Sequence, residues 1–256
     1  GKSTISTNLA VGLENLGFTT GLLDADIWGF SIPRLLGIEG RLEANKDKKI
    51  VPYKRGGLEV VSTGLITDDE DTALMWRGLM LSKALEQFLF DVEWGNLDYL
   101  VIDLPPGTGD IQMALGRLLP QTELVVVTTP QLSAQKVATR VADMAKRSFI
   151  PLLGVVENMS YFESGDGNKY NIFGKGGGDE LSEKFGIPLL SKIPISEDSI
   201  EESENGTPIL LQNNKTPTKE AMQDLVNTII KVLPPVSDET CTGRLAKVLE
   251  ELEVEA

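Results

Sequence analysis

A carboxylate and a glycine-rich turn follow an apolar strand in the middle of the chain. Residues 101–110 read Val-Ile-Asp-Leu-Pro-Pro-Gly-Thr-Gly-Asp, so an apolar run ends at Asp103 and passes directly into a turn. A carboxylate at the end of such a strand reaches a Mg²⁺ ion, usually through a water, and Gly107 lets the backbone approach a γ-phosphate. An ionised Asp there is costly unless something pairs with it. We therefore predict that Asp103 and Gly107 belong to a phosphate and Mg²⁺ site.

The first four residues match the final part of a phosphate-binding loop. Gly1-Lys2-Ser3-Thr4 corresponds to the end of the P-loop pattern G-x-x-x-x-G-K-[ST]. Because the chain opens on this motif without a methionine, we expect the preceding glycines and the strand that feeds them to lie upstream. Four residues are a weak motif alone, so the interpretation depends on its partner motifs. An amphipathic helix follows, with one apolar face made by Ile5, Leu9, Leu13 and Leu16.

Two more sets of polar residues follow apolar segments that predict strands. Asp24 and Asp26 end a short apolar segment, and carboxylates with this spacing hold a hydrated Mg²⁺, orient a water or cap a turn. Asn158 follows the segment 152–157, where its amide can read a purine edge or stabilise a turn. These alternatives stay open. The glycine-rich stretch 174–178 lacks a preceding apolar strand and a following Ser or Thr, so we interpret it as a loop before a helix.

The elements that must position these residues alternate between strands and helices. Apolar or β-branched segments predict strands at 58–62, 99–103, 123–129, 152–157 and 189–193. Helical periodicity predicts helices at 79–90, after a cap at Ser133, at 179–185 and from a Thr216 cap to Leu233. This alternation implies right-handed βαβ crossovers and a parallel sheet.

The predicted fold is α/β, with a doubly wound, mostly parallel sheet, helices on both faces and the first strand missing from the chain. We expect residues 1–233 to form one P-loop ATPase domain that is truncated at its N-terminus. The pair Pro234-Pro235 begins the remaining segment, 234–256, which we expect to be a linker and a short acidic C-terminal helix or tail.

Composition excludes several kinds of chemistry. A chain without histidine has no Ser-His triad, no His general base and no His metal ligand, which leaves carboxylates, lysines, hydroxyls and backbone amides. The net charge of −14 argues against binding to nucleic acid or anionic lipid. A single cysteine, Cys241, excludes an intrachain disulfide and fits a reducing compartment. With no signal-like leader and no apolar run long enough for a bilayer, we expect a cytoplasmic protein.

Taken together, five segments closely resemble the Mrp/ApbC family of P-loop ATPases, which act as iron–sulfur cluster carriers and are related to MinD, ParA and the nitrogenase iron protein. The resemblance covers residues 1 to 233 and depends on the sequence, order and spacing of the motifs. The five segments are Gly1 to Thr4, LDADIWGFSIP at 23–33, WRGLM at 76–80, DLPPGTGD at 103–110 and ENMSYF at 157–162.

The resemblance implies roles at the phosphate end of the site. Lys2 would bind the β- and γ-phosphates of ATP, Ser3 would ligate Mg²⁺, and Thr4 would donate to the α-phosphate. Asp26 would position the attacking water, which makes it a catalytic residue with Lys2. Asp103 would hold the Mg²⁺ shell.

The resemblance also implies contacts to the rest of the nucleotide and to a second subunit. Asn158 and the segment around Pro194 would contact adenine, and Gly1 and Gly107 would complete the nucleotide-binding set. Family members dimerise with ATP between the subunits, so a homodimer is expected. The P-loop lysine that reaches the partner's nucleotide in relatives is not in this chain.

The chain departs from the family where relatives bind their cluster. Many family members carry Cys-x-x-Cys after the Asn-Met-Ser-Tyr-Phe stretch, and paired subunits share one cluster through these thiolates. Here residues 163–170 read Glu-Ser-Gly-Asp-Gly-Asn-Lys-Tyr, without a thiol. Four-thiolate bridging at this position is therefore impossible. We expect Cys241 to have a structural or incidental role.

The predicted function is that of a Mg²⁺-dependent ATPase of the Mrp type, implicated by the resemblance in iron–sulfur cluster assembly or transfer, with client apoproteins as partners. One alternative is a nucleotide-switched module that binds a client without carrying a cluster. A second is a MinD- or ParA-like positioning ATPase. The acidic stretch 250–255 counts against the second, because membranes and DNA would repel it.

Overall fold

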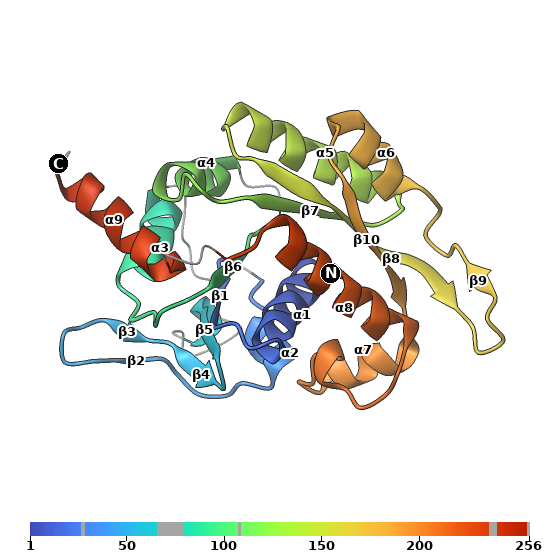
Figure 1. Cartoon of the computed structure of the whole chain (residues 1–256), viewed down its shortest axis with the longest axis horizontal. Helices are drawn as coiled ribbons and strands as arrows, with labels where there is room; N and C mark the ends of the chain where they lie inside the picture. Colours follow the sequence, from blue (N-terminus) through green and yellow to red (C-terminus); the bar gives the residue numbers. More distant parts are fainter. Residues whose placement is uncertain (27–28, 66–78, 107–108, 236–239, 255–256) are drawn as a thin grey trace.

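Helices and strands alternate along most of the chain, as Figure 1 shows for the computed structural model, which describes residues 1–26, 29–65, 79–106, 109–235 and 240–254. The helices are α1 Lys2–Asn15, α2 Ile32–Leu36, η1 Thr63–Leu65, α3 Leu79–Phe90, α4 Gly109–Leu118, α5 Leu132–Arg147, α6 Gly177–Phe185, α7 Glu197–Glu204, η2 Ile209–Leu211, α8 Pro217–Val232 and α9 Cys241–Val254. The strands are β1 Thr20–Asp24, β2 Glu43–Ala44, β3 Ile50–Val51, β4 Tyr53–Arg55, β5 Leu58–Ser62, β6 Tyr99–Asp103, β7 Leu124–Thr128, β8 Leu152–Glu163, β9 Lys169–Tyr170 and β10 Leu189–Ile195.

Most of these strands lie in two sheets. One sheet has the order β4-β5-β1-β6, and the other has the order β10-β8-β7 with β9 paired to β8. β1 runs parallel to β5 and β6, and β8 runs parallel to β7 and β10. Antiparallel pairing joins β4 to β5 and β9 to β8. The prediction of an α/β fold with mostly parallel sheets is therefore confirmed.

Apolar side chains of β1 enter two different clusters. Leu22 belongs to a cluster with residues of α1 and α8, whereas its neighbour Leu23 belongs to a cluster with residues of α3, α4 and α9. Successive side chains of a strand point to opposite faces, so helices cover this sheet on both sides. A third cluster joins α5 and α6 to β7 and β8.

A cavity separates the two sheets. β6 is the last strand of the first sheet and β7 is the last strand of the second, and both strands line a cavity of about 740 Å³. We call this cavity the β6–β7 slot. Its volume corresponds to roughly 25 water molecules at about 30 Å³ each, so it is far larger than an ordinary packing defect.

Two local predictions differ from the structure, and a third is confirmed. β8 continues past Asn158 to Glu163, because its last residues pair with β9. α5 begins at Leu132 after Gln131, without a side-chain cap, so the predicted cap at Ser133 is wrong. The predicted cap at Thr216 is confirmed, because its side chain accepts a hydrogen bond from the Lys219 amide.

The C-terminal helix packs on the rest of the protein. α9 starts at Cys241, whose amide donates to the Leu97 carbonyl at 2.7 Å, and Leu245 is buried in the cluster with α3 and α4. A helix thus lies within the segment 234–256, and it packs on α3 and the other members of that cluster. Within the described parts of the chain, no helix is both long and apolar enough to cross a membrane.

Candidate functional site

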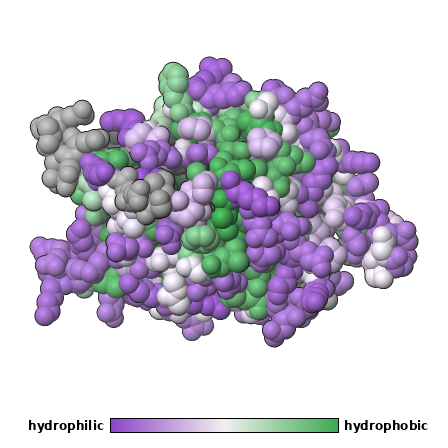
Figure 2. Space-filling model, viewed as in Figure 1, coloured by the Kyte–Doolittle hydropathy of each residue, from purple (hydrophilic) through white to green (hydrophobic). Residues whose placement is uncertain are grey.

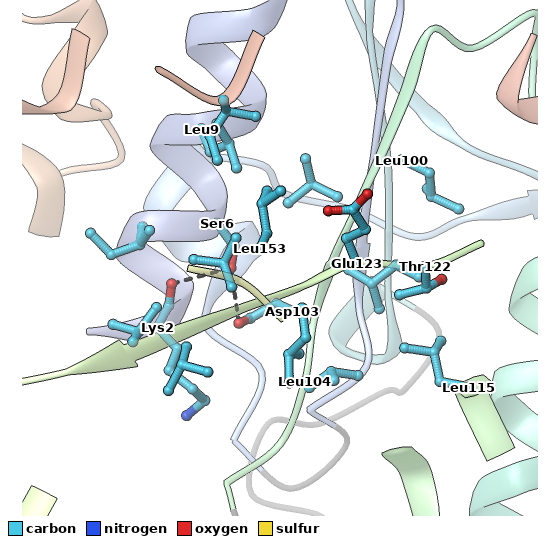
Figure 3. A pocket seen from close by; sticks show the side chains of 18 of the residues that line it. Lys2, Ser6, Leu9, Leu100, Asp103, Leu104, Leu115, Thr122, Glu123 and Leu153 are labelled. Carbon is cyan, nitrogen blue, oxygen red and sulfur yellow. Dashed lines mark hydrogen bonds between the residues drawn. The ribbon is translucent and has the colours of Figure 1, made fainter. Parts of the chain in front are cut away.

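The candidate site lies where the N-terminus of α1 meets the carboxyl ends of β1, β6 and β8. Lys2 is the first residue of α1 and Asp103 is the last residue of β6, and Figure 3 shows both side chains at one end of the slot. In parallel α/β sheets, the crevice at the carboxyl ends of the strands is the usual place for a ligand.

The N-terminus of α1 has no side-chain cap. Gly1 is the N-cap residue, and no carboxylate lies in the first turn of the helix. The first amides of a helix and its dipole favour an anion at this end. The structure thus places Gly1, Lys2, Ser3 and Thr4 at a helix terminus that suits a phosphate group.

Asp103 has one carboxylate oxygen without a partner. Its Oδ1 accepts a hydrogen bond from the Ser6 hydroxyl at 3.1 Å, which Figure 3 shows as a dashed line. Its Oδ2 is buried and has no hydrogen-bond partner among the described residues. Burial raises the pKa of Asp103, while the Ser3 and Ser6 hydroxyls and the Lys2 charge oppose that shift. A ligand such as a metal-bound water would satisfy the remaining oxygen.

Asp24 forms a second buried carboxylate beside Asp103. The two residues are directly opposite each other in the β1–β6 register. Asp24 is fully buried and accepts hydrogen bonds from the Ser62 hydroxyl at 2.9 Å and the Asp26 amide at 3.2 Å. Burial and repulsion from Asp103 raise the pKa of Asp24 to about 7, although these hydrogen bonds oppose the shift. Asp24, one of the two carboxylates that the sequence offered for Mg²⁺, a water or a turn, thus lies in the site and accepts from the turn that follows it, whereas Ser6 is a part of the site that the motifs did not identify.

Asp26 lies in the turn just after β1. Its charge contributes to the raised pKa of Asp103, so the two carboxylates are near each other. The Gly29 amide donates to the Asp26 carbonyl at 3.3 Å, and a side chain at Gly29 would come within 3.5 Å of the Asp26 carboxylate. The structure therefore brings Asp26 to the predicted site.

Asn158 contacts the start of α1. A Cβ atom on Gly1 would lie 2.1 Å from the Asn158 amide nitrogen, so the close approach requires glycine. The Asn158 side-chain oxygen accepts from the Met159 amide at 3.0 Å, and Met159 has a positive φ of 53°. This turn of the backbone points the Asn158 side chain at the site while β8 continues.

Glu157 fixes the residue before Asn158. It is buried, and its carboxylate accepts from the Ser160 hydroxyl and from the Gly178 amide at the start of α6, both at 2.5 Å. The same carboxylate therefore occupies the N-terminus of α6, which agrees with the interpretation that the 174–178 loop does not bind phosphate. No motif identified this network, because it depends on a contact between distant segments.

Two predicted site residues, Pro194 and Gly107, are not among the described residues that line the slot. Pro194 is buried in β10 and its carbonyl accepts from the Thr218 hydroxyl at 3.0 Å, but it does not line the slot. It follows Ile193, which pairs with Asn158. Gly107 and the segment 76–78 lie outside the described residues.

The donor set fits Mg²⁺ and does not fit a cluster held by thiolates. Asp103 and Ser3 supply hard oxygen atoms, as Mg²⁺ prefers, and among the described residues no group of three His, Cys, Asp or Glu side chains could hold a metal. A metal here would need phosphate and water to complete its shell. Cys241, the one cysteine of the chain, lies in α9, and its amide donates to the Leu97 carbonyl. Leu97 lies just before β6, six residues ahead of Asp103 in the sequence.

The site combines an uncapped helix N-terminus with buried carboxylates at the carboxyl ends of parallel strands. This combination defines an α/β phosphate-binding protein of the P-loop type. The ParA profile described as NUBPL iron-transfer P-loop NTPase matches residues 1–230. The chain therefore belongs to this family of iron–sulfur carrier P-loop NTPases, as the motifs predicted.

Individual relatives agree with this assignment. The iron–sulfur cluster carrier protein of Aquifex aeolicus is 43% identical over 235 residues, which cover 91% of this chain and 65% of the relative. That of Saccharolobus solfataricus is 37% identical and covers 91% of this chain and 80% of the relative. This chain thus spans slightly less than two thirds of the Aquifex aeolicus protein.

Solved structures show the same fold. A nucleotide-binding protein from Archaeoglobus fulgidus, in complex with ADP, superposes with a TM-score of 0.68 at 36% identity and covers 80% of this chain and 81% of that protein. MinD from Pyrococcus horikoshii, complexed with Mg-ADP, has a TM-score of 0.66 at 18% identity and covers 91% of this chain and 92% of that protein. At that identity, the MinD likeness concerns the fold alone.

Proposed function

We propose that this chain binds ATP with Mg²⁺, hydrolyses it, and acts in iron–sulfur cluster assembly or transfer. The observation that carries the proposal is the unpartnered Asp103 oxygen beside the uncapped N-terminus of α1. A phosphate and its metal ion supply what each of these groups lacks. The ADP complex of the Archaeoglobus fulgidus relative supports the same type of ligand.

The proposed roles follow from the chemistry of each side chain. Lys2 and the first amides of α1 bind the β- and γ-phosphates, Ser3 ligates Mg²⁺, and Thr4 donates to the α-phosphate. Asp26 orients the attacking water, and Asp103 holds the metal shell through water. Bound Mg²⁺ would neutralise charge on the phosphate oxygens.

The proposal also covers the adenine contacts, the complete fold and the assembly. Asn158 contacts adenine together with the backbone near Pro194, and Gly107 lies against the γ-phosphate. The fold is a doubly wound P-loop domain over residues 1–233, in which a further parallel strand would join the two sheets. Two such subunits would form a homodimer that acts on client apoproteins.

Replacement of Lys2 tests the ATPase proposal. We expect Lys2→Ala to reduce ATP hydrolysis about 100-fold or more, because the variant loses a charged donor to the transferred phosphate. Lys231→Ala is the matched control, since it removes the same charge from the last turn of α8. Hydrolysis is measured by phosphate release at saturating Mg²⁺. Equal rates for the two variants would contradict the assigned role of Lys2.

A nucleotide-switched client-binding module is the second candidate. It is favoured by the β8–β9 hairpin, which occupies the region where relatives carry Cys-x-x-Cys but contains no cysteine. Anaerobic reconstitution with iron and sulfide separates the candidates. A cluster bound per dimer supports carriage, whereas ATP-dependent binding of a client by metal-free protein supports the switch.

A further inference from the structure

Three exposed cations on α4 and α5 have no partner. Arg117 lies in the last turn of α4, and Lys136 and Arg140 lie one turn apart on α5. Among the described residues, none of the three side chains forms a hydrogen bond or an ion pair. Lys136 is close to the N-terminus of α5, where the helix dipole disfavours a cation. The stability of the helix therefore does not explain this residue.

The other charged side chains of α5 have partners. Arg147 pairs with Asp143 at 2.9 Å, and Lys146 donates to the Phe185 carbonyl at 3.1 Å. Asp143 is the one acidic residue of α5, and Arg147 already matches its charge. The exposed side of α5 thus keeps a net positive charge, although the whole chain carries −14. A surface whose sign is opposite to that of the protein attracts an anionic partner locally.

Exposed apolar side chains lie among these cations. Met113 of α4 is 48% exposed, and Leu132 at the start of α5 is 70% exposed. Arg117 follows Met113 by one turn and Lys136 follows Leu132 by one turn, so each cation shares a side of its helix with an apolar residue. α4 and α5 contact each other. Figure 2 shows hydrophobic and hydrophilic residues intermingled along the upper side of the molecule, where Figure 1 draws these two helices.

Phe149 is exposed in a backbone conformation that does not suit it. It follows the C-terminus of α5 with a φ of 59°, and its side chain is 93% exposed. Gly or Asn is usual at such a position, because a Cβ atom makes the left-handed conformation costly. A ring that is exposed to this extent gains almost nothing from packing to offset that cost. The observation favours a contact with another molecule.

Phe149 lies beside the end of α4. A Cβ atom on Gly116 would come within 3.5 Å of the Ser148 carbonyl oxygen and 3.1 Å of the Ile150 side chain. Arg117 and Phe149 therefore directly follow two residues that touch each other, one in each segment. The three cations and the three apolar side chains form one surface, which we call the α4–α5 face: Met113, Arg117, Leu132, Lys136, Arg140 and Phe149.

The charge of the rest of the chain decides which anion suits this face. Nucleic acid and anionic membranes extend beyond the face, and they would meet the acidic remainder of a chain with a net charge of −14. Exposed charges interact over about 8 Å at physiological salt, so a short acidic segment on the face experiences mainly the three cations. The exposed apolar side chains require apolar residues in the same segment.

We propose that the α4–α5 face docks an acidic peptide segment of a partner protein. Its carboxylates pair with the three cations, and its aliphatic or aromatic side chains contact the three apolar residues. None of the six residues of the face lines the β6–β7 slot. Docking therefore does not require nucleotide, and this proposal and the ATPase proposal can fail separately.

A fluorescent acidic peptide tests the proposal on the full chain without nucleotide. The probe is Glu-Leu-Glu-Glu-Leu-Phe-Glu-Glu, and fluorescence anisotropy measures its Kd. Lys136→Glu combined with Arg140→Glu should raise the Kd about ten-fold or more, because each change removes an attraction and adds a repulsion. Lys231→Glu is the matched control at an exposed position of α8, which Figure 1 draws on the other side of β7 from α5. It should change the Kd by less than about two-fold.

Phe149→Asn gives a second test that does not depend on charge. Asn adopts a positive φ more readily than Phe, so the variant should unfold at a higher temperature than the unchanged chain. The same variant should bind the peptide about five-fold more weakly, because an apolar contact is lost. A loss of binding in a more stable protein cannot result from unfolding.

The outcomes separate the acidic peptide from other anions. Weaker binding in the charge-reversed variant and in Phe149→Asn, with the control unchanged, supports the proposal. An equal Kd for the charge-reversed variant and the control would overturn it, and so would an unchanged Kd in Phe149→Asn. Tighter binding of a single-stranded oligonucleotide or of phosphatidylserine vesicles than of the peptide would also overturn it, since the face would then serve an extended polyanion.

Discussion

The strands β1 and β6 have the same length and different surroundings. Each has five residues and ends in a buried aspartate, and the two aspartates are opposite each other in the register. β1 has a strand on both edges and all five of its residues are buried, whereas β6 borders the slot and its three middle residues are only partly buried. The neighbours of a strand, rather than its own residues, therefore decide how much it contributes to stability.

The largest expected difference concerns leucines in the two strands. Leu23→Ala in β1 should lower the free energy of unfolding by about 2–5 kcal/mol, because it leaves a cavity in closely packed surroundings. Leu100→Ala in β6 should cost about 1–2 kcal/mol, since that side chain already borders the open slot. Urea denaturation measures both values. If the two losses are equal, β6 is packed as well as β1 and the contrast between the strands fails.

The next effect concerns the pH dependence of stability. The pKa of Asp24 rises from 3.8 to about 7 on folding, so the folded protein keeps this proton to a higher pH than the unfolded chain. Stability should therefore fall as the pH rises from about 4 to about 7, by up to about 1.4 kcal/mol per unit. Asp24→Asn should flatten this slope in metal-free buffer. The exposed Asp91→Asn should leave it in place, and an unchanged slope in Asp24→Asn would exclude Asp24 as its source.

The smallest effect concerns the hydroxyls beside the two aspartates. Ser62 donates to Asp24 in a fully buried bond, and Ser6 donates to Asp103 in a partly buried one. Ser62→Ala should cost about 1–1.5 kcal/mol and Ser6→Ala about 0.5 kcal/mol, since water reaches the second site more easily. Thermal denaturation with the same buffer for both variants gives the comparison. A larger loss for Ser6→Ala would show that Asp103 is better shielded from water than Asp24 and depends more on its hydroxyl donor.

The sequence was sufficient for features that depend on local pattern. The apolar runs and their terminal acids predicted the parallel strands, and the motif around Lys2 predicted which helix begins at the site. The Thr216 cap could be predicted because a cap needs only a hydroxyl at the right distance from a helical pattern. The family follows from the same motifs, since their order and spacing are a property of the chain alone.

The other features depend on contacts between distant segments. The Asp24–Asp103 pair requires the β1–β6 register, and the Glu157 network requires α6 to approach β8. Aspartates at the ends of two parallel strands could have indicated the first of these, because such ends meet at one edge of a sheet. The docking of α9 could not be predicted from the segment alone, because Leu245 is buried in a cluster whose other members, residues of α3 and α4 among them, are distant in the sequence.

The position of Cys241 makes this thiol a natural reporter. It lines the slot, burial raises its pKa, and no second cysteine competes with it for a reagent. Its rate of alkylation should therefore depend on how often water and small electrophiles reach the amino end of β6. Stopped-flow labelling of the unmodified chain would record that opening as a time course, without an engineered probe.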